Sequence, residues 1–112
     1  MKFIWFWEYE QKDTLKMFEM NSRVGLEREK YPEKYPKKVY DAHWLGMEPK
    51  GFTIYDVDNP QQIINLEVAF SPVKKSRFVP LFDHKSVVDT YLREKKDNPD
   101  FVFKKRKYGE CE

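Results

Sequence analysis

The segment KFIWFWEY, residues 2–9, constrains the fold more than any other part of the chain. Its aromatic and β-branched residues favour a strand, and alternate side chains of a strand point to opposite faces. One face therefore carries Phe3, Trp5, Trp7 and Tyr9, and the other carries Ile4 and Phe6. A strand that is apolar on both sides belongs in the middle of a sheet with cover on each face. We expect helices on one face and a second subunit on the other.

The rest of the chain supplies the helices and strands for such a sheet. Apolar spacing, capping residues and turn residues predict helices over 14–30, 61–70 and 83–96, and further strands over 39–45, 52–57 and 73–82. The order β, α, β, β, α, β predicts an α+β ferredoxin-like sandwich with an antiparallel four-stranded sheet, followed by an extra helix and a tail. Residues 1–96 are the predicted domain and residues 97–112 the tail. Pro80 places the last strand at a sheet edge, because proline cannot donate to a ladder.

Each of the first two helices is expected to bury one apolar stripe. For the first helix the stripe is Leu15, Phe18, Ser22 and Gly25, widened by Met17, Met20 and Val24. For the second helix it is Ile63, Ile64, Leu66, Val68 and Phe70.

Composition excludes several classes of protein. Charged residues make up 36% of the chain, but the net charge is only +2, so bulk electrostatics argue against a nucleic-acid partner. The lone cysteine, Cys111, rules out an intrachain disulfide and favours a reducing, cytoplasmic location. The apolar run at the N-terminus is too short for a signal peptide, and no run could span a bilayer, so we expect a soluble protein without membrane contact.

The middle of the chain resembles a known family. YDAHW, a short turn, GFTIYDVDNPQQI and then FVPLF are similar to an uncharacterised family of small, dimeric α/β-barrel proteins with a Tyr-x-Ala-x-Trp strand. The matching positions are Tyr40, Ala42, Trp44, Phe52, Asp58, Val79 and Pro80. The resemblance implies a ferredoxin-like fold and a homodimer whose two sheets face each other as a barrel, and it implies no activity. The chain departs from the family pattern at Phe70, where the family tends to have tryptophan, and in its longer YPEKYPKK connection.

His43 and Asp41 are the candidate catalytic residues. Two residues apart on one strand, they are expected to share a face, where a carboxylate can orient an imidazole for proton transfer. The alternative is a hydrogen-bonded polar pair at a sheet edge or dimer seam. His43 and His84 lack a third ligand at metal-site spacing, so we expect no metal and no cofactor.

Trp5, Trp7, Trp44 and Tyr55 are the candidate ligand-binding residues. Aromatic side chains with a few polar groups are the usual lining of a small-molecule site. The same four rings can equally be core or dimer interface.

The predicted tail combines aromatic residues with the basic run Lys104, Lys105, Arg106 and Lys107. This run is a candidate partner-binding segment, although the acidic residues around it offset its charge. The leading hypothesis is a dimeric binding or accessory module that holds a small hydrophobic ligand between its two sheets. The alternatives are an enzyme that resembles cofactor-independent monooxygenases and uses His43, and a scaffold that contacts a protein or nucleic acid through the tail.

Overall fold

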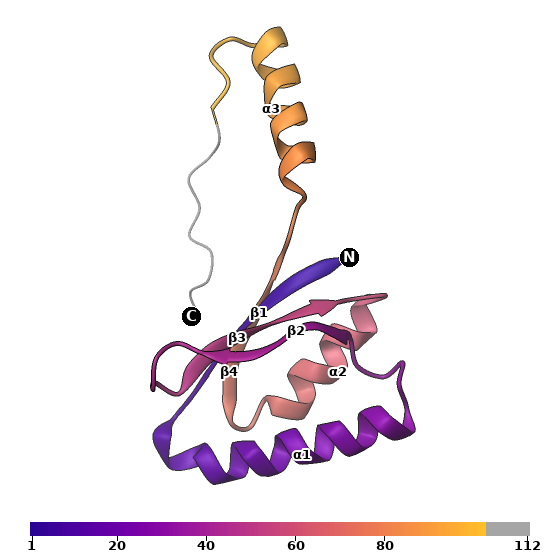
Figure 1. The fold of residues 1–112 in the computed structure, drawn as a ribbon, viewed down its shortest axis with the longest axis vertical. Helices are drawn as coiled ribbons and strands as arrows, with labels where there is room; N and C mark the ends of the chain where they lie inside the picture. The colour runs from indigo at the N-terminus through magenta and orange to yellow at the C-terminus, as the bar shows by residue number, and fades with distance from the viewer. Residues whose placement is uncertain (103–112) are drawn as a thin grey trace.

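The computed structural model describes residues 1–102 of the 112-residue chain (Figure 1). Its helices and strands follow one another in the order β, α, β, β, α, β, α. They are β1 (Lys2–Tyr9), the single turn η1 (Gln11–Asp13), α1 (Thr14–Lys30), β2 (Lys37–Trp44), β3 (Lys50–Asp56), α2 (Pro60–Phe70), β4 (Lys74–Pro80) and α3 (His84–Asp97). Every predicted helix and strand is present, with bounds that shift by no more than two residues.

The four strands form one antiparallel sheet in the order β2-β3-β1-β4. This order is consistent with a ferredoxin-like α+β fold. The apolar opening strand, β1, is central, and β4 with Pro80 is at an edge, as the sequence predicts. Because β1 is paired with β3 on one edge and β4 on the other, its apolar side chains have cross-strand neighbours on both faces of the sheet.

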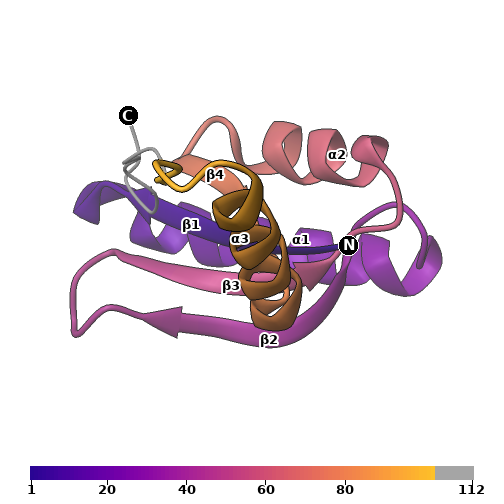
Figure 2. The ribbon, with the colours of Figure 1, turned by 90° about the horizontal axis from the view of Figure 1, so that it is seen from above.

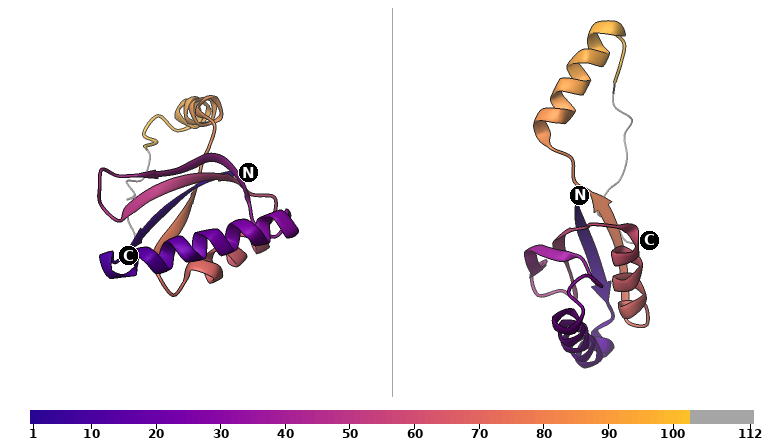
Figure 3. Two further views of the ribbon diagram at one scale, coloured as in Figure 1. Left: turned by 60° about the horizontal axis from the view of Figure 1, so that its bottom comes forward. Right: turned by 90° about the vertical axis from the view of Figure 1, so that its right-hand side faces the viewer.

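α1 and α2 both pack against one face of the sheet, which we call the covered face (Figure 1, Figure 3). The core lies between the sheet and these two helices, and the strands contribute most of its aromatic rings. Its buried apolar members are Trp5, Trp7, Tyr9, Met17, Val24, Tyr35, Tyr55, Val57, Leu66, Phe70 and Val73.

The opposite face of the sheet, which we call the open face, is apolar and only half-buried. Side chains alternate along β1 and β3, so the residues between the core positions point to this face. They include Ile4, Phe6, Phe52 and Ile54, each of intermediate exposure.

The predicted stripe of α1 is only partly correct. Met17 and Val24 are buried and Met20 packs against the core, whereas Leu15 and Phe18 are exposed. Both sets have helical spacing, so periodicity could not choose between them. The packing of α1 against the sheet determines which of the two sets is buried.

The predicted stripe of α2 is too broad. Leu66 and Phe70 are buried, but Ile64 and Val68 are exposed. A polar residue, Gln62, is buried instead. Its side chain accepts a hydrogen bond from the Asp58 backbone amide at 2.8 Å and donates one to the Glu33 carbonyl at 3.0 Å, so its polar atoms are satisfied.

The hairpin of β2 and β3 is irregular. Gly46 has a φ of 65° in its turn, a conformation that glycine adopts without strain. The register shifts between Lys38 and Tyr40 and again between Tyr40 and His43. These shifts interrupt the alternation along β2, so Asp41 and His43 do not share a face as expected. Tyr40 and His43 both stack with Phe52 of the open face, whereas Trp44 contacts Trp7 of the covered face.

α3 stands away from the rest of the molecule, on the side of the open face (Figure 1, Figure 2). Asp83 caps it by accepting a hydrogen bond from the Ser86 amide at 3.1 Å. None of its residues is buried, although Val87, Val88, Tyr91 and Leu92 give it an apolar stripe. We call this helix the arm. It ends at Asp97, next to the predicted boundary at residue 96.

Candidate functional site

The four predicted ligand-binding residues line one cavity. Trp5 and Trp7 reach it from β1, Trp44 from β2 and Tyr55 from β3. The cavity holds about 240 Å³ and is closed on its other side by Met17, Phe18 and Asn21 of α1. We call it the aromatic cleft. It lies on the covered face within one chain, and therefore not in the space between two sheets where a ligand was expected.

The rings of the cleft are held by contacts with one another. The centroids of Trp7 and Trp44 are 6.0 Å apart in an edge-to-face arrangement, and those of Trp5 and Tyr55 are 5.9 Å apart. Trp5, Trp7 and Tyr55 are core residues, whereas 39% of Trp44 is exposed. The three buried rings therefore form rigid inner walls, and Trp44 lies where the cleft meets solvent.

The cleft also has polar lining groups, and several of them are already bonded. The Trp7 indole N–H donates to the Thr53 hydroxyl at 3.3 Å. Burial raises the pKa of the Tyr55 hydroxyl to about 12, so this group stays protonated at neutral pH.

At the β2 side of the cleft, Asp41 accepts hydrogen bonds from the Ala42 backbone amide at 2.8 Å and from the Lys38 ammonium at 3.1 Å. These bonds lower the pKa of the Asp41 carboxyl.

Lys74 also lines the cleft, and the sequence analysis missed it. It is the first residue of β4 and pairs with Tyr9 in the register. The signal was present in the sequence. The alternation that places Phe78 on the covered face continues backward through Ser76 to Lys74, but a lysine at the end of a strand is usually solvated.

His43 lies on the other side of the sheet. Its ring stacks on Tyr40 with centroids 4.3 Å apart and faces the Phe52 ring at 6.1 Å. His43 Nδ1 donates to the backbone carbonyl of Asp41 at 2.7 Å, and the Asp41 carboxylate binds Lys38 and Ala42 instead. The expected pairing of the two side chains is therefore not formed, because the register shift turns them to different faces. Proton transfer by His43 stays a prediction.

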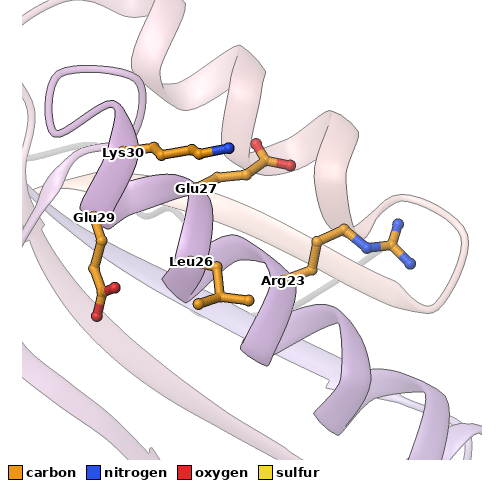
Figure 4. A pocket seen from close by; sticks show the side chains of 5 residues that line it. All are labelled: Arg23, Leu26, Glu27, Glu29 and Lys30. Atoms are coloured by element: carbon orange, nitrogen blue, oxygen red, sulfur yellow. The ribbon is translucent and has the colours of Figure 1, made fainter.

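Two other hollows lined by described residues gather no comparable set of aromatic groups. One of about 490 Å³ is lined by Arg23, Leu26, Glu27, Glu29 and Lys30, all from α1 (Figure 4). Glu29 points away from the ends of Glu27 and Lys30 in that view. Another, of about 450 Å³, is lined mainly by charged residues of the β1–η1 and α2–β4 connections. Within residues 1–102, no group of three or more histidine, cysteine or acidic side chains is arranged to hold a metal ion.

Two further expectations concern membranes and the tail. No helix in the described part of the chain is long and apolar enough to cross a bilayer. Lys104, Lys105, Arg106 and Lys107 lie outside the described residues, so the predicted partner-binding segment stays a prediction.

Comparisons with protein-family models, with curated proteins and with solved structures found no match to this chain. The family resemblance of YDAHW and FVPLF is thus supported only in its coarse form, an α+β fold with a four-stranded antiparallel sheet.

Proposed function

We propose that this chain is a homodimeric binding module that holds a small, flat, apolar ligand in the aromatic cleft. The observation that carries the ligand proposal is the convergence of four aromatic rings from three strands on one cavity. An apolar cavity of about 150 Å³ is enough to accept benzene. A cleft of about 240 Å³ therefore suits a ligand of one or two fused rings.

Two aromatic residues of β2 provide a matched test of the cleft. Trp44 is 39% exposed and lies on the covered face, and Tyr40 is 47% exposed and lies on the open face. We expect the neutral probe naphthamide to quench tryptophan fluorescence saturably in the unmodified protein. Trp44→Ala should weaken its affinity about tenfold, because an aromatic contact and buried area are lost. Tyr40→Ala should leave it unchanged. Equal effects of the two variants, or no saturable binding, would refute the proposal.

The homodimer proposal rests on two apolar surfaces that the described chain covers only in part or not at all. One is the open face with the half-buried Ile4, Phe52 and Ile54, and the other is the stripe of the arm with the exposed Val87, Val88 and Leu92. Contiguous apolar surfaces that face solvent mark interaction sites in soluble proteins. The arm stands on the same side of the sheet as the open face (Figure 1), so a second copy facing the sheet could reach both, and the relation would be reciprocal in a twofold dimer.

A charge on the open face tests the dimer. Ile54→Asp should convert a dimer into a monomer in sedimentation equilibrium, because association would bury an unpaired carboxylate. Ile64→Asp places the same charge on the outer side of α2, where 51% of Ile64 is exposed, and should leave the dimer intact. A monomeric unmodified protein at micromolar concentration would contradict the proposal.

A further inference from the structure

The ammonium group of Lys74 is enclosed by aromatic rings. Its Nζ lies 4.1 Å from the ring centroid of Phe70, 4.7 Å from that of Trp5 and 4.9 Å from that of Trp7. The faces of aromatic rings attract a cation, but they replace only part of the hydration that an ammonium loses on burial. The remaining cost shows in the pKa of Lys74, which burial and, to a smaller degree, the charge of Lys38 lower to about 7.

The Lys74 ammonium has no counter-ion within residues 1–102: no hydrogen bond or ion pair joins its Nζ to any described residue. Lys74 also borders the hollow lined by Glu8, Glu10 and Asp13, but no hydrogen bond or ion pair joins its ammonium to these carboxylates. Glu67 and Asp41 are engaged elsewhere. Glu67 of α2 accepts the Trp5 indole N–H at 3.0 Å and the Ser76 hydroxyl at 2.9 Å. Asp41 binds Lys38 and the Ala42 amide.

Lys74 is only half-buried as a residue, but its ammonium lies among aromatic rings without an acceptor. This arrangement is unusual, because charges removed from water in proteins are normally paired. Lys74 lines the same cleft as the aromatic rings, so a molecule held between those rings would meet its ammonium group. An anionic oxygen on that molecule would supply the missing partner, and such a pair is stronger among aromatic rings than in bulk water.

We infer that the aromatic cleft selects ring-bearing carboxylates, with the flat ring between the aromatic walls and the carboxylate paired to Lys74. This inference rests on the proposed binding function and names its ligand class. Lys74 acts as a specificity-determining residue, since it separates acids from neutral molecules of the same shape.

The other titratable groups around Lys74 do not obscure its role. Tyr9 of β1 and Tyr55 of β3 have pKa values raised by burial and remain neutral near pH 7. The pKa of Asp41 is lowered, so this group remains ionised alongside Lys38 of β2. Glu67 of α2 is held by Trp5 and Ser76. α1 lines the cleft with Met17, Phe18 and Asn21, none of which titrates.

The experiment compares naphthoate with naphthamide, which share a ring system and differ in charge. At pH 6 we expect naphthoate to bind the unmodified protein at least tenfold more tightly. Lys74→Met should abolish the preference while keeping the affinity for naphthamide. The neighbouring control, Lys75→Met, changes an exposed residue on the opposite face of β4. It should preserve the preference for naphthoate over naphthamide.

Proton uptake gives a second readout that needs no variant. A bound carboxylate raises the pKa of Lys74, so at about pH 8 naphthoate should bind with uptake of up to about one proton, and naphthamide with none. Calorimetry in buffers of different ionisation enthalpy measures this number. If naphthamide binds and naphthoate binds no better, without proton uptake, the inference is overturned and the binding function stands. If neither ligand binds, the binding function itself is refuted.

Discussion

The two faces of the sheet carry similar residues but have different surroundings. Along β1, Trp5 and Trp7 point to the covered face and are nearly inaccessible, whereas Ile4 and Phe6 point to the open face and stay half-buried. The difference arises from the connections. Both helices that link strands within the sheet pack on one side, and the helix that follows the last strand projects away from the other (Figure 3). One chain thus completes one core and leaves a second apolar surface.

This asymmetry separates two kinds of site. On the covered face, tight packing fixes the aromatic walls of the cleft and surrounds the Lys74 ammonium with rings. On the open face, Tyr40, His43 and Phe52 form a stacked row in which Tyr40 and His43 are exposed. The proposed ligand site therefore depends on the fold of one chain, whereas the proposed dimer would depend on association through the open face.

The strongest test of the covered face is Gly51→Ala. Gly51 pairs with Trp7 on one side and Trp44 on the other, and the Trp7 ring lies over it. A methyl group there would meet the His43 backbone carbonyl and come within 2.7 Å of the Trp7 ring. We expect a loss of about 4 kcal/mol in the free energy of unfolding, or no stable fold, in urea denaturation.

The matched control for Gly51 is Gly25→Ala in α1. An added methyl group at Gly25 meets no atom within 4 Å, and alanine is a better helix former than glycine. This variant should be more stable than the unmodified protein by about 0.5–1 kcal/mol. A stable Gly51→Ala variant would mean that the packing of Trp7 is looser than described.

Truncation of Leu66 is the next largest effect. Leu66 of α2 has an exposure of 0%, so Leu66→Ala removes buried methyl groups and leaves a cavity in the core. We expect a loss of about 3 kcal/mol, measured by thermal or urea unfolding. Ile64→Ala, on the exposed side of the same helix, should cost less than about 0.5 kcal/mol. A large cost at Ile64 instead would show that its side of α2 is also covered, by a partner.

Substitution of Lys74 should stabilise the protein at neutral pH. The pKa of Lys74 is about 7 in the folded state, against 10.5 for a solvated lysine such as that of the unfolded chain. Between about pH 7 and pH 10.5 the unfolded chain therefore binds more protons than the folded chain. Stability therefore rises with pH across this window, and below about pH 7 the cost of the buried ammonium is fully present. Lys74→Met should be more stable by about 2 kcal/mol at pH 6, because the rings offset only part of that cost.

The pH dependence distinguishes this effect from better packing. The stability advantage of Lys74→Met should shrink between about pH 7 and pH 10. In this range Lys74 of the folded protein is increasingly neutral, so the cost of placing its charge among the rings is lost. An advantage that is constant with pH would contradict a buried ammonium. Lys75→Met should show neither effect, because Lys75 is exposed.

Much of the fold was predictable from the sequence because its signals are local. Prolines, glycines and caps place the ends of the elements: Asn59 and Pro60 begin α2, Asp83 caps α3 and Gly46 forms the hairpin turn. The edge position of β4 followed from Pro80. These residues restrict the backbone by their own chemistry, whatever surrounds them.

The site was predictable only in part, because it depends on where elements meet. The four aromatic residues do line one cavity, since their strand positions share a face. The pairing of Asp41 with His43 was wrong because a register shift in β2 is invisible in the alternation of its residues. Lys74 was missed because its burial is created by Phe70, which lies in a different element. Long-range packing determines these features.

The smallest effects are expected from alanine substitutions at two helix caps, one on each side of the sheet. Asn59 caps α2 by accepting a hydrogen bond from the Gln62 amide at 3.2 Å, and Asp83 caps the arm in the same way. Replacing a cap residue by alanine costs about 1 kcal/mol of helix stability. α2 is part of the core, so Asn59→Ala should lower the global free energy of unfolding by that amount.

The arm buries no residue against its own chain, so in a monomer Asp83→Ala should reduce helicity near residue 84 without changing global unfolding. In the proposed twofold dimer each copy packs its arm on the other, so Asp83→Ala removes two caps and should instead weaken association by up to about 2 kcal/mol, about thirtyfold in the dissociation constant. Circular dichroism and sedimentation on the two variants measure both quantities. Equal losses of global stability in dilute, dissociated protein would mean that the arm already belongs to the core of its own chain, and the contrast between the two faces would then fail.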